Sequence, residues 1–163
     1  MKKNKLVLLL FLPLLISCSK VPEYEGIKIQ LEYAEEGGLF LSTPDLMYSD
    51  VISKGKDKVV LFTVDGCAAC NEAKTQINSF GVGFHCKIDE INMNSIDIAG
   101  GDYDKIVATT TYLDDLYKFP EIDDATFPML YMFKSRGVAM VKQDNFIDAL
   151  RMYTEVVNVP INE

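Results

Sequence analysis

The chain has 163 residues, 48% of them hydrophobic, and a formal net charge of −8 at pH 7. This acidic balance argues against a nucleic-acid partner and against an electrostatic hold on anionic lipid, because both surfaces repel negative charge. The length suits one domain with a sizeable core, and we find no internal repeat or low-complexity tract.

The first residues have the pattern of an export signal. Three lysines precede an apolar run over residues 6–16, which is shorter than the roughly 20 residues that a membrane span needs. The run ends in Leu-Ile-Ser before Cys18, which resembles the bacterial lipobox, where the signal is cut before a cysteine that carries a diacylglycerol. We expect residues 1–17 to be a lipoprotein signal peptide and Cys18 to be lipidated. The alternative is an ordinary signal peptide cut nearby.

Both interpretations place the mature protein outside the cytoplasm, in an oxidising compartment where disulfides persist. The lipid on Cys18 would supply the membrane attachment. Ser19 stands where an aspartate is associated with inner-membrane retention, so we expect the outer membrane, facing the periplasm, if the cell has two membranes. Residues 18–26 are expected to be a lipid-anchored tether and residues 27–163 the folded domain.

The first part of the domain predicts two strands and a short helix. Residues 27–33 alternate apolar and polar side chains, the pattern of a half-buried strand. The glycines at 37–38 predict a turn into residues 39–41, and therefore a hairpin. Thr43, followed by a proline, predicts the N-cap of a short helix that ends before Gly55.

The middle of the chain predicts a strand, a helix and a strand. Val59–Val64 is an apolar, mostly β-branched run, typical of a strand buried on both faces. Helical spacing follows Cys67, and Gly81 and Gly83 are expected to break the helix. Residues 84–91 then alternate as a second strand. We expect its polar residues to form a solvated face: Lys87 and Asp89.

The last part predicts a long helix over 103–119, a strand over 129–133 and a second strand over 138–141 that makes a hairpin with it. Asp144 is expected to cap a final helix that reaches Val157. The element order predicts an α/β fold, with a mixed sheet of four to five strands between helices.

Cys67 and Cys70 lie at the junction of the buried strand and the helix. A sulfur at the start of a helix sits among unpaired N–H groups at the positive end of the dipole, which favours the thiolate, the attacking species. Cys70 lies one turn further in. The pattern predicts a redox pair in which Cys67 opens a substrate disulfide and Cys70 resolves the mixed disulfide.

Other uses of the cysteines stay open. The pair could form a static structural disulfide. A zinc site would need four ligands, and His85 and Cys86 could complete a set with the pair. These two are adjacent on a predicted strand, however, so their side chains should point to opposite faces. Cys86 shares a face with apolar residues, so we expect a buried core thiol.

Two stretches together resemble the thioredoxin family: VVLFTVDGCAAC, ending at Cys70, and TFPMLYMFK over 126–134. The resemblance covers about residues 56–157 and implies a thioredoxin-like fold. It implies that Pro128 faces the dithiol in the cis form and that the backbone of Phe127 contacts substrate. It also implies thiol–disulfide exchange with protein or peptide partners through a Cys67–Cys70 disulfide, without metal or organic cofactor. We expect a monomer.

The chain departs from the family pattern in several places. Asp65 and Gly66 stand where thioredoxins have an aromatic residue, and Ala68-Ala69 lacks the usual proline between the cysteines. The buried aspartate that accepts a proton in thioredoxins aligns with Leu61, and Asp65 is a candidate replacement. The interval to Pro128 is also longer than usual, which we attribute to an extended segment over 92–120.

From these observations we expect a membrane-anchored, extracytoplasmic thiol–disulfide oxidoreductase. The alternative is a non-catalytic binding or secretion-accessory lipoprotein that keeps the fold and a structural disulfide. The departures beside the dithiol leave the direction of electron flow open.

Overall fold

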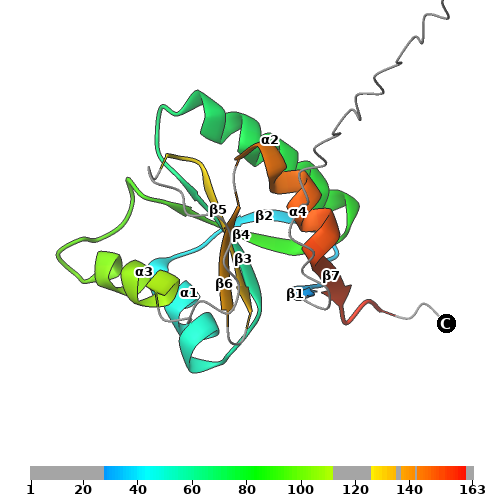
Figure 1. Ribbon diagram of the computed structural model, residues 1–163, viewed down its shortest axis with the longest axis horizontal. Helices are drawn as coiled ribbons and strands as arrows, with labels where there is room; N and C mark the ends of the chain where they lie inside the picture. The colour runs from blue at the N-terminus through cyan, green and yellow to red at the C-terminus, as the bar shows by residue number, and fades with distance from the viewer. Residues whose placement is uncertain (1–27, 112–125, 135–136, 142, 161–163) are drawn as a thin grey trace, which may run out of the picture.

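The computed structural model describes four stretches of the chain, residues 28–111, 126–134, 137–141 and 143–160 (Figure 1). Their centre is a five-stranded mixed sheet in the order β2-β4-β3-β5-β6. β2, β4 and β3 are parallel, whereas β5 is antiparallel to both β3 and β6. The strands are β2 (Gly38–Leu41), β3 (Lys58–Thr63), β4 (Lys87–Asn92), β5 (Met129–Lys134) and β6 (Gly137–Val141). The predicted α/β sheet is therefore confirmed.

Helices cover both faces of this sheet, and the sheet divides the core into two clusters, one on each face (Figure 1). α2 (Ala68–Gly83) and α4 (Phe146–Tyr153) pack on one face, against side chains such as Leu61 and Ile88. α1 (Pro44–Tyr48), its π-helical continuation (Ser49–Ser53) and α3 (Asp102–Thr111) lie on the other. Because both faces are covered, the central strand β3 is buried on both sides, as its sequence predicts.

The expected hairpin before Thr43 is wrong. β1 (Ile29–Glu32) pairs in parallel with β7 (Thr154–Val157), and β2 pairs with β4. The turn between β1 and β2 is held against the end of α2 instead of folding back on itself. The N–H of Gly38 donates to the carbonyl of Cys86, and a Cβ on Gly37 would lie 2.3 Å from the carbonyl oxygen of Gly81.

The final helix is shorter than expected. α4 ends at Tyr153, and the next four residues form β7, so Val157 lies in a strand. Three of those four residues are β-branched, which favours an extended backbone. Asp144 does not cap α4 either, because it lies in a short 3₁₀ turn (Gln143–Asn145) that precedes the helix.

Two expectations for the middle of the chain are also wrong. Phe84 does not lie in the second strand: it follows α2, which passes through Gly81 and ends at Gly83, and it is 52% exposed and stacked on Phe80. Asp89 does not lie on a solvated face: it is 3% exposed and forms an ion pair with Lys58. A strand whose two faces are both covered has no solvated side, so its charged residues must find partners inside.

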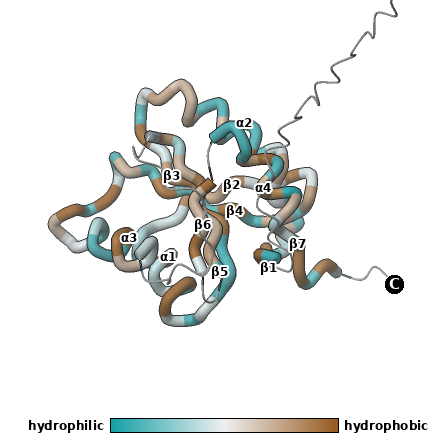
Figure 2. The backbone as a smooth tube through the Cα atoms, viewed as in Figure 1, coloured by the Kyte–Doolittle hydropathy of each residue, from teal (hydrophilic) through white to brown (hydrophobic). Residues whose placement is uncertain are grey.

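Several predictions fall outside the described residues: the signal peptide (1–17), the lipidated Cys18, the tether (18–26) and the part of the helix 103–119 beyond Thr111. Within the described stretches, no helix is both long and apolar enough to cross a membrane. Figure 2 shows that the loop between β4 and α3 carries apolar residues, and Ile98 in this loop is 72% exposed.

Candidate functional site

Cys67 and Cys70 lie at the N-terminus of α2, as the sequence predicts. After β3 ends at Thr63, a turn with Gly66 at φ +71° leads to Cys67, the N-cap residue of the helix. The backbone N–H of Cys70 donates to the sulfur of Cys67 at 3.0 Å. The sulfur therefore occupies the place of a capping oxygen, at the helix end where negative charge is stabilised.

The two cysteines form a disulfide, with Cα atoms 5.2 Å apart. Their surroundings differ. Cys67 is half-buried, whereas Cys70 is only 1% exposed. Because thiol–disulfide exchange needs direct access to the attacked or attacking sulfur, a partner can approach Cys67 and not Cys70.

Phe127 and Pro128 lie beside the dithiol although they are far from it in the sequence. β5 runs antiparallel to β3, and this pairing brings the start of β5 next to the end of β3. The Phe127–Pro128 peptide bond is cis, as expected, and Pro128 is buried. The carbonyl oxygen of Phe127 lies 3.8 Å from the sulfur of Cys67. The two motifs therefore meet at one place on the surface.

Asp65 is not a buried acid in this structure. Its side chain is exposed, and its carboxylate accepts a hydrogen bond from the amide of Asn92 at 2.7 Å. Its backbone N–H donates to the side chain of Asn94 at 2.7 Å. These bonds tie the turn before Cys67 to the end of β4. Leu61, where thioredoxins have their acid, is fully buried in the apolar core.

The neighbouring strand β4 carries a buried acid that was not predicted from the sequence. Glu90 is 4% exposed, and its carboxylate contacts Thr63 and Lys74. It lies in the run KIDEIN between the buried Ile88 and Ile91, and the signal that could have found it is an acid on the strand next to β3, whose burial on both faces was predicted.

Cys86 is fully buried, and burial raises the pKa of its thiol to about 11. Its neighbour His85 is exposed, and its Nδ1 lies 3.0 Å from the carbonyl of Glu35. In the residues that the structure describes, no group of three or more His, Cys, Asp or Glu side chains is placed to hold a metal ion.

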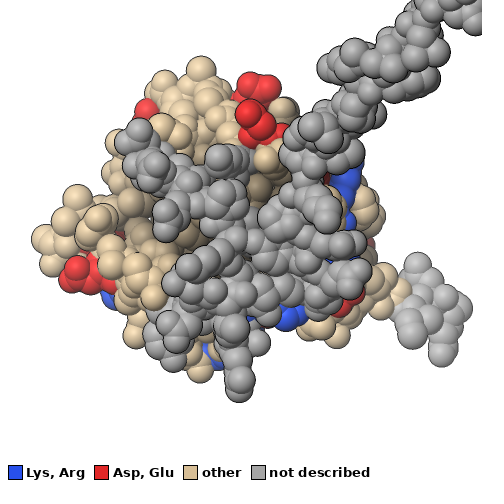
Figure 3. Space-filling model, viewed as in Figure 1, with Lys and Arg blue, Asp and Glu red and all other residues tan. Residues whose placement is uncertain are grey.

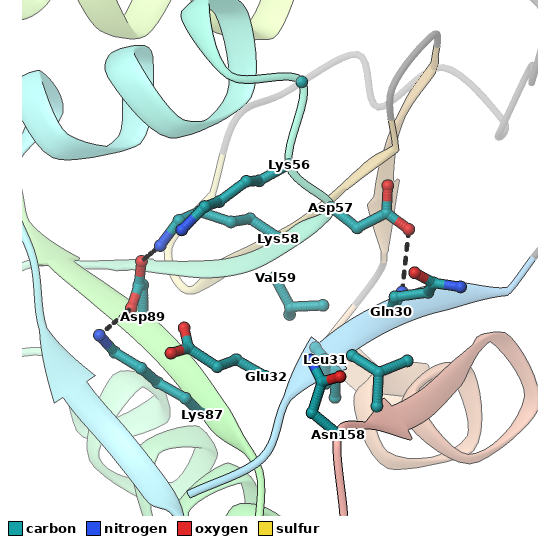
Figure 4. Close-up of a pocket in the computed structure, with 12 residues that line it drawn as sticks. Gln30, Leu31, Glu32, Lys56, Asp57, Lys58, Val59, Lys87, Asp89 and Asn158 are labelled. Atoms are coloured by element: carbon teal, nitrogen blue, oxygen red, sulfur yellow. Dashed lines mark hydrogen bonds and ion pairs between the residues drawn. The ribbon is translucent and has the colours of Figure 1, made fainter.

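A pocket opens at the opposite end of β3 and β4 from the dithiol (Figure 4). Lys58 and Lys87 both point toward Asp89 there, and Lys58 also lies 3.2 Å from Asp50. These charges neutralise one another within the protein, so we assign the cluster to the stability of the fold.

No protein-family model matches the chain, and no curated protein matches its sequence. Among solved structures, oxidised thioredoxin O2 from Arabidopsis thaliana is similar with a TM-score of 0.50 and 11% identity, over 74% of this chain and 96% of that one. Oxidised thioredoxin O1 from the same plant has a TM-score of 0.49 and 13% identity, over 72% of this chain and 99% of that one. Thioredoxin f from spinach chloroplast has a TM-score of 0.49 and 14% identity, over 73% of this chain and 96% of that one.

At such low identity the likeness shows the fold alone, and thioredoxin O2 is the comparison that carries it. In this chain the fold comprises the five-stranded mixed sheet, the helices on both of its faces and the cysteine pair at the start of α2. The chain therefore has a thioredoxin-like fold, as its two sequence motifs predict.

Proposed function

We propose that the protein is an extracytoplasmic thiol–disulfide oxidoreductase that acts on protein or peptide partners through Cys67 and Cys70. The observation that carries the proposal is the approach of the cis Phe127–Pro128 peptide to the half-buried sulfur of Cys67, 3.8 Å from the Phe127 carbonyl. A disulfide that only held a turn together would need neither an accessible sulfur nor a facing platform.

In the reducing direction, the thiolate of Cys67 attacks one sulfur of a partner disulfide. The partner S–S bond breaks, a mixed disulfide forms on Cys67, and the partner's other sulfur leaves as a thiolate that takes up a proton. Cys70 then loses its proton and attacks the sulfur of Cys67, which forms the Cys67–Cys70 bond and releases the partner's second thiol. Two electrons pass to the partner in each cycle, and oxidation of a partner dithiol is the reverse sequence.

Phe127 and Pro128 are proposed as the platform that orients the partner. The backbone of Phe127 lies beside Cys67 at the start of β5, and we propose that its carbonyl accepts a hydrogen bond from an extended peptide N–H. Such contacts recognise main chain, so they suit partners of varied sequence. No metal or organic cofactor takes part in this exchange, because the electrons move between sulfurs.

The membrane attachment is proposed from the sequence. Cys18 would carry the lipid, residues 18–26 would be the tether, and the domain would face the periplasm from the outer membrane in a cell with two membranes. We expect wild-type protein in the membrane fraction to incorporate labelled palmitate. Cys18→Ala should carry no label and leave that fraction. Equal labelling of both would exclude lipidation at Cys18.

The activity is tested by reduction and reoxidation of a peptide with a single disulfide. We expect Cys67→Ser to lose turnover and Cys86→Ser, a matched change at a buried cysteine, to keep it. The alternative, a binding or secretion-accessory protein with a structural disulfide, predicts that wild type is no faster than Cys67→Ser.

A further inference from the structure

A buried ionic cluster lies under the start of α2. We call Thr63, Lys74 and Glu90 the Glu90 cluster. The carboxylate of Glu90 accepts a hydrogen bond from the hydroxyl of Thr63 at 2.7 Å and forms an ion pair of 2.7 Å with Lys74. Both contacts end on the same oxygen, Oε1. Glu90 is 4% exposed, and a buried carboxylate is costly unless such partners compensate it.

The three residues connect this carboxylate to the dithiol. Lys74 follows Cys70 by four residues on α2, so both lie on one face of the helix. A helical side chain covers the turn on the N-terminal side of its own Cα, which for Lys74 is the turn that contains Cys70. Thr63 is the last residue of β3, just before the turn that leads to Cys67. The carboxylate therefore lies between the end of β3 and the N-terminal half of α2, on the face of the helix that carries Cys70.

The resolving step of the proposed cycle needs a proton acceptor at this place. Cys70 is 1% exposed, so bulk water does not reach its thiol freely. Leu61 is apolar, and Asp65 is exposed and bonded to Asn92. Glu90 is therefore the residue that offers a buried carboxylate on the face covered by α2, among the residues that the structure describes.

The other buried acids serve elsewhere. Asp50 and Asp89 both contact Lys58, at the start of β3. Asp89 is adjacent to Glu90 on β4, so its side chain points to the opposite face of the sheet. It is consequently a natural control for any effect of Glu90.

We propose that Glu90 is the base that takes the proton of Cys70 when Cys70 resolves the mixed disulfide. The Cys70 S–H bond breaks, and the proton goes to the carboxylate of Glu90, whose Oε1 Thr63 and Lys74 hold in place. The Cys70 thiolate attacks the Cys67 sulfur, the Cys67–Cys70 bond forms, and the partner leaves as a thiolate. The proton then passes to solvent beside Lys74, whose side chain is 39% exposed. This inference rests on the proposed function.

The test uses the reduced full chain and the small disulfide 5,5′-dithiobis(2-nitrobenzoate). Attack by Cys67 releases a first coloured thiolate at a rate that depends on reagent concentration. Resolution by Cys70 releases a second coloured thiolate at a rate that is independent of reagent concentration. We expect Glu90→Gln to slow the second phase at least about tenfold at pH 6, with less effect at pH 9, where hydroxide deprotonates the thiol. The first phase should change less than about threefold.

Two further variants separate proton transfer from structure. Lys74→Met keeps the carboxylate but removes the ion pair that holds its Oε1 in place, so the second phase should slow at pH 6 while the first phase does not change. Asp89→Asn also removes a buried carboxylate, and it should leave the pH profile of the second phase unchanged. If circular dichroism shows that Glu90→Gln does not fold, the rate of the second phase in Lys74→Met tests the proposal instead.

The proposal is overturned if the second phase has the same rate and pH profile in wild type and in the folded variants at Glu90 and Lys74. It is also overturned if Asp89→Asn shifts that profile as much as they do. Because the reagent reports resolution directly, a wild-type protein that shows the Glu90-dependent phase and yet turns over no peptide disulfide would contradict the proposed function alone.

Discussion

At the scale of single residues, Cys67 and Cys70 are joined by one bond but lie in different surroundings. Cys67 caps α2 and is partly accessible, with the Phe127 carbonyl beside it, while Cys70 is enclosed. This asymmetry is what a two-step exchange needs, since the first sulfur must meet a partner and the second must meet only the first. A local pattern of strand, turn, two cysteines and helix was enough to predict it.

Cys86 provides a test of burial at the same scale. Burial raises the pKa of its thiol to about 11, so the reactive thiolate is scarce at pH 8. We expect iodoacetamide to modify Cys67 in the reduced, folded protein and to leave Cys86 unmodified, as measured by mass spectrometry of peptides. In denaturant both should react. Equal labelling of the two cysteines without denaturant would contradict the burial of Cys86.

At the scale of elements, local patterns were predicted better than pairings. The run Val59–Val64 and the motif TFPMLYMFK each predicted a strand correctly, because the signal lies within a few residues. The partner of β1 could not be predicted, because it is β7, more than 100 residues away, and a short alternation of apolar and polar residues does not specify a partner. The roles of Asp89 and Glu90 were missed for a related reason: they depend on helices that cover both faces of the sheet.

The close contact between α2 and the start of β2 gives a prediction for this scale. A Cβ on Gly81 would lie 2.6 Å from the Cα of Gly38, which is backbone and cannot move aside cheaply. We expect Gly81→Ala to lower the free energy of unfolding by about 1–3 kcal/mol in urea denaturation. Gly83, in the same helix, has open space around it. Gly83→Ala should be neutral or stabilising by up to about 1 kcal/mol. Equal effects of the two changes would argue against the close contact.

At the scale of the whole molecule, acidic side chains lie both on the surface and in the interior, and the two sets are arranged differently. On the face shown in Figure 3, acidic side chains lie in separate groups near α2 and near α3 instead of forming one patch. Inside, Asp50 and Asp89 share Lys58, which joins the helical segment after α1 to the starts of β3 and β4. Burial alone would raise the pKa of Asp50, but hydrogen bonds from Lys54 and Lys58 outweigh it and lower that pKa below its usual value.

This network predicts how stability depends on pH. An aspartate whose pKa is lowered by folding stabilises the protein fully above its unfolded value of about 3.9, and the stabilisation is lost as the pH falls through the folded value. We expect the free energy of unfolding to fall below about pH 4, and Asp50→Asn to be less stable at pH 7 with a shallower acid loss. An identical acid loss in both proteins would exclude this contribution.

The dependence of stability on pH in the alkaline range follows from Lys58. Burial opposes its charge, but the bonds to Asp89 and Asp50 outweigh burial and raise its pKa. A lysine of this kind stabilises the fold below its unfolded pKa of about 10.4, and the stabilisation is lost as the pH rises through the folded value.

The central claim is that Cys67 and Cys70 form a redox pair and not a structural disulfide. Their reduction potential tests this claim most directly. It can be measured by equilibrating the full chain with glutathione or dithiothreitol buffers and counting the two thiols by mass spectrometry. We predict a potential above about −300 mV, in the range of pairs that exchange with partners. A potential below about −300 mV, in the range of structural disulfides, would contradict the account.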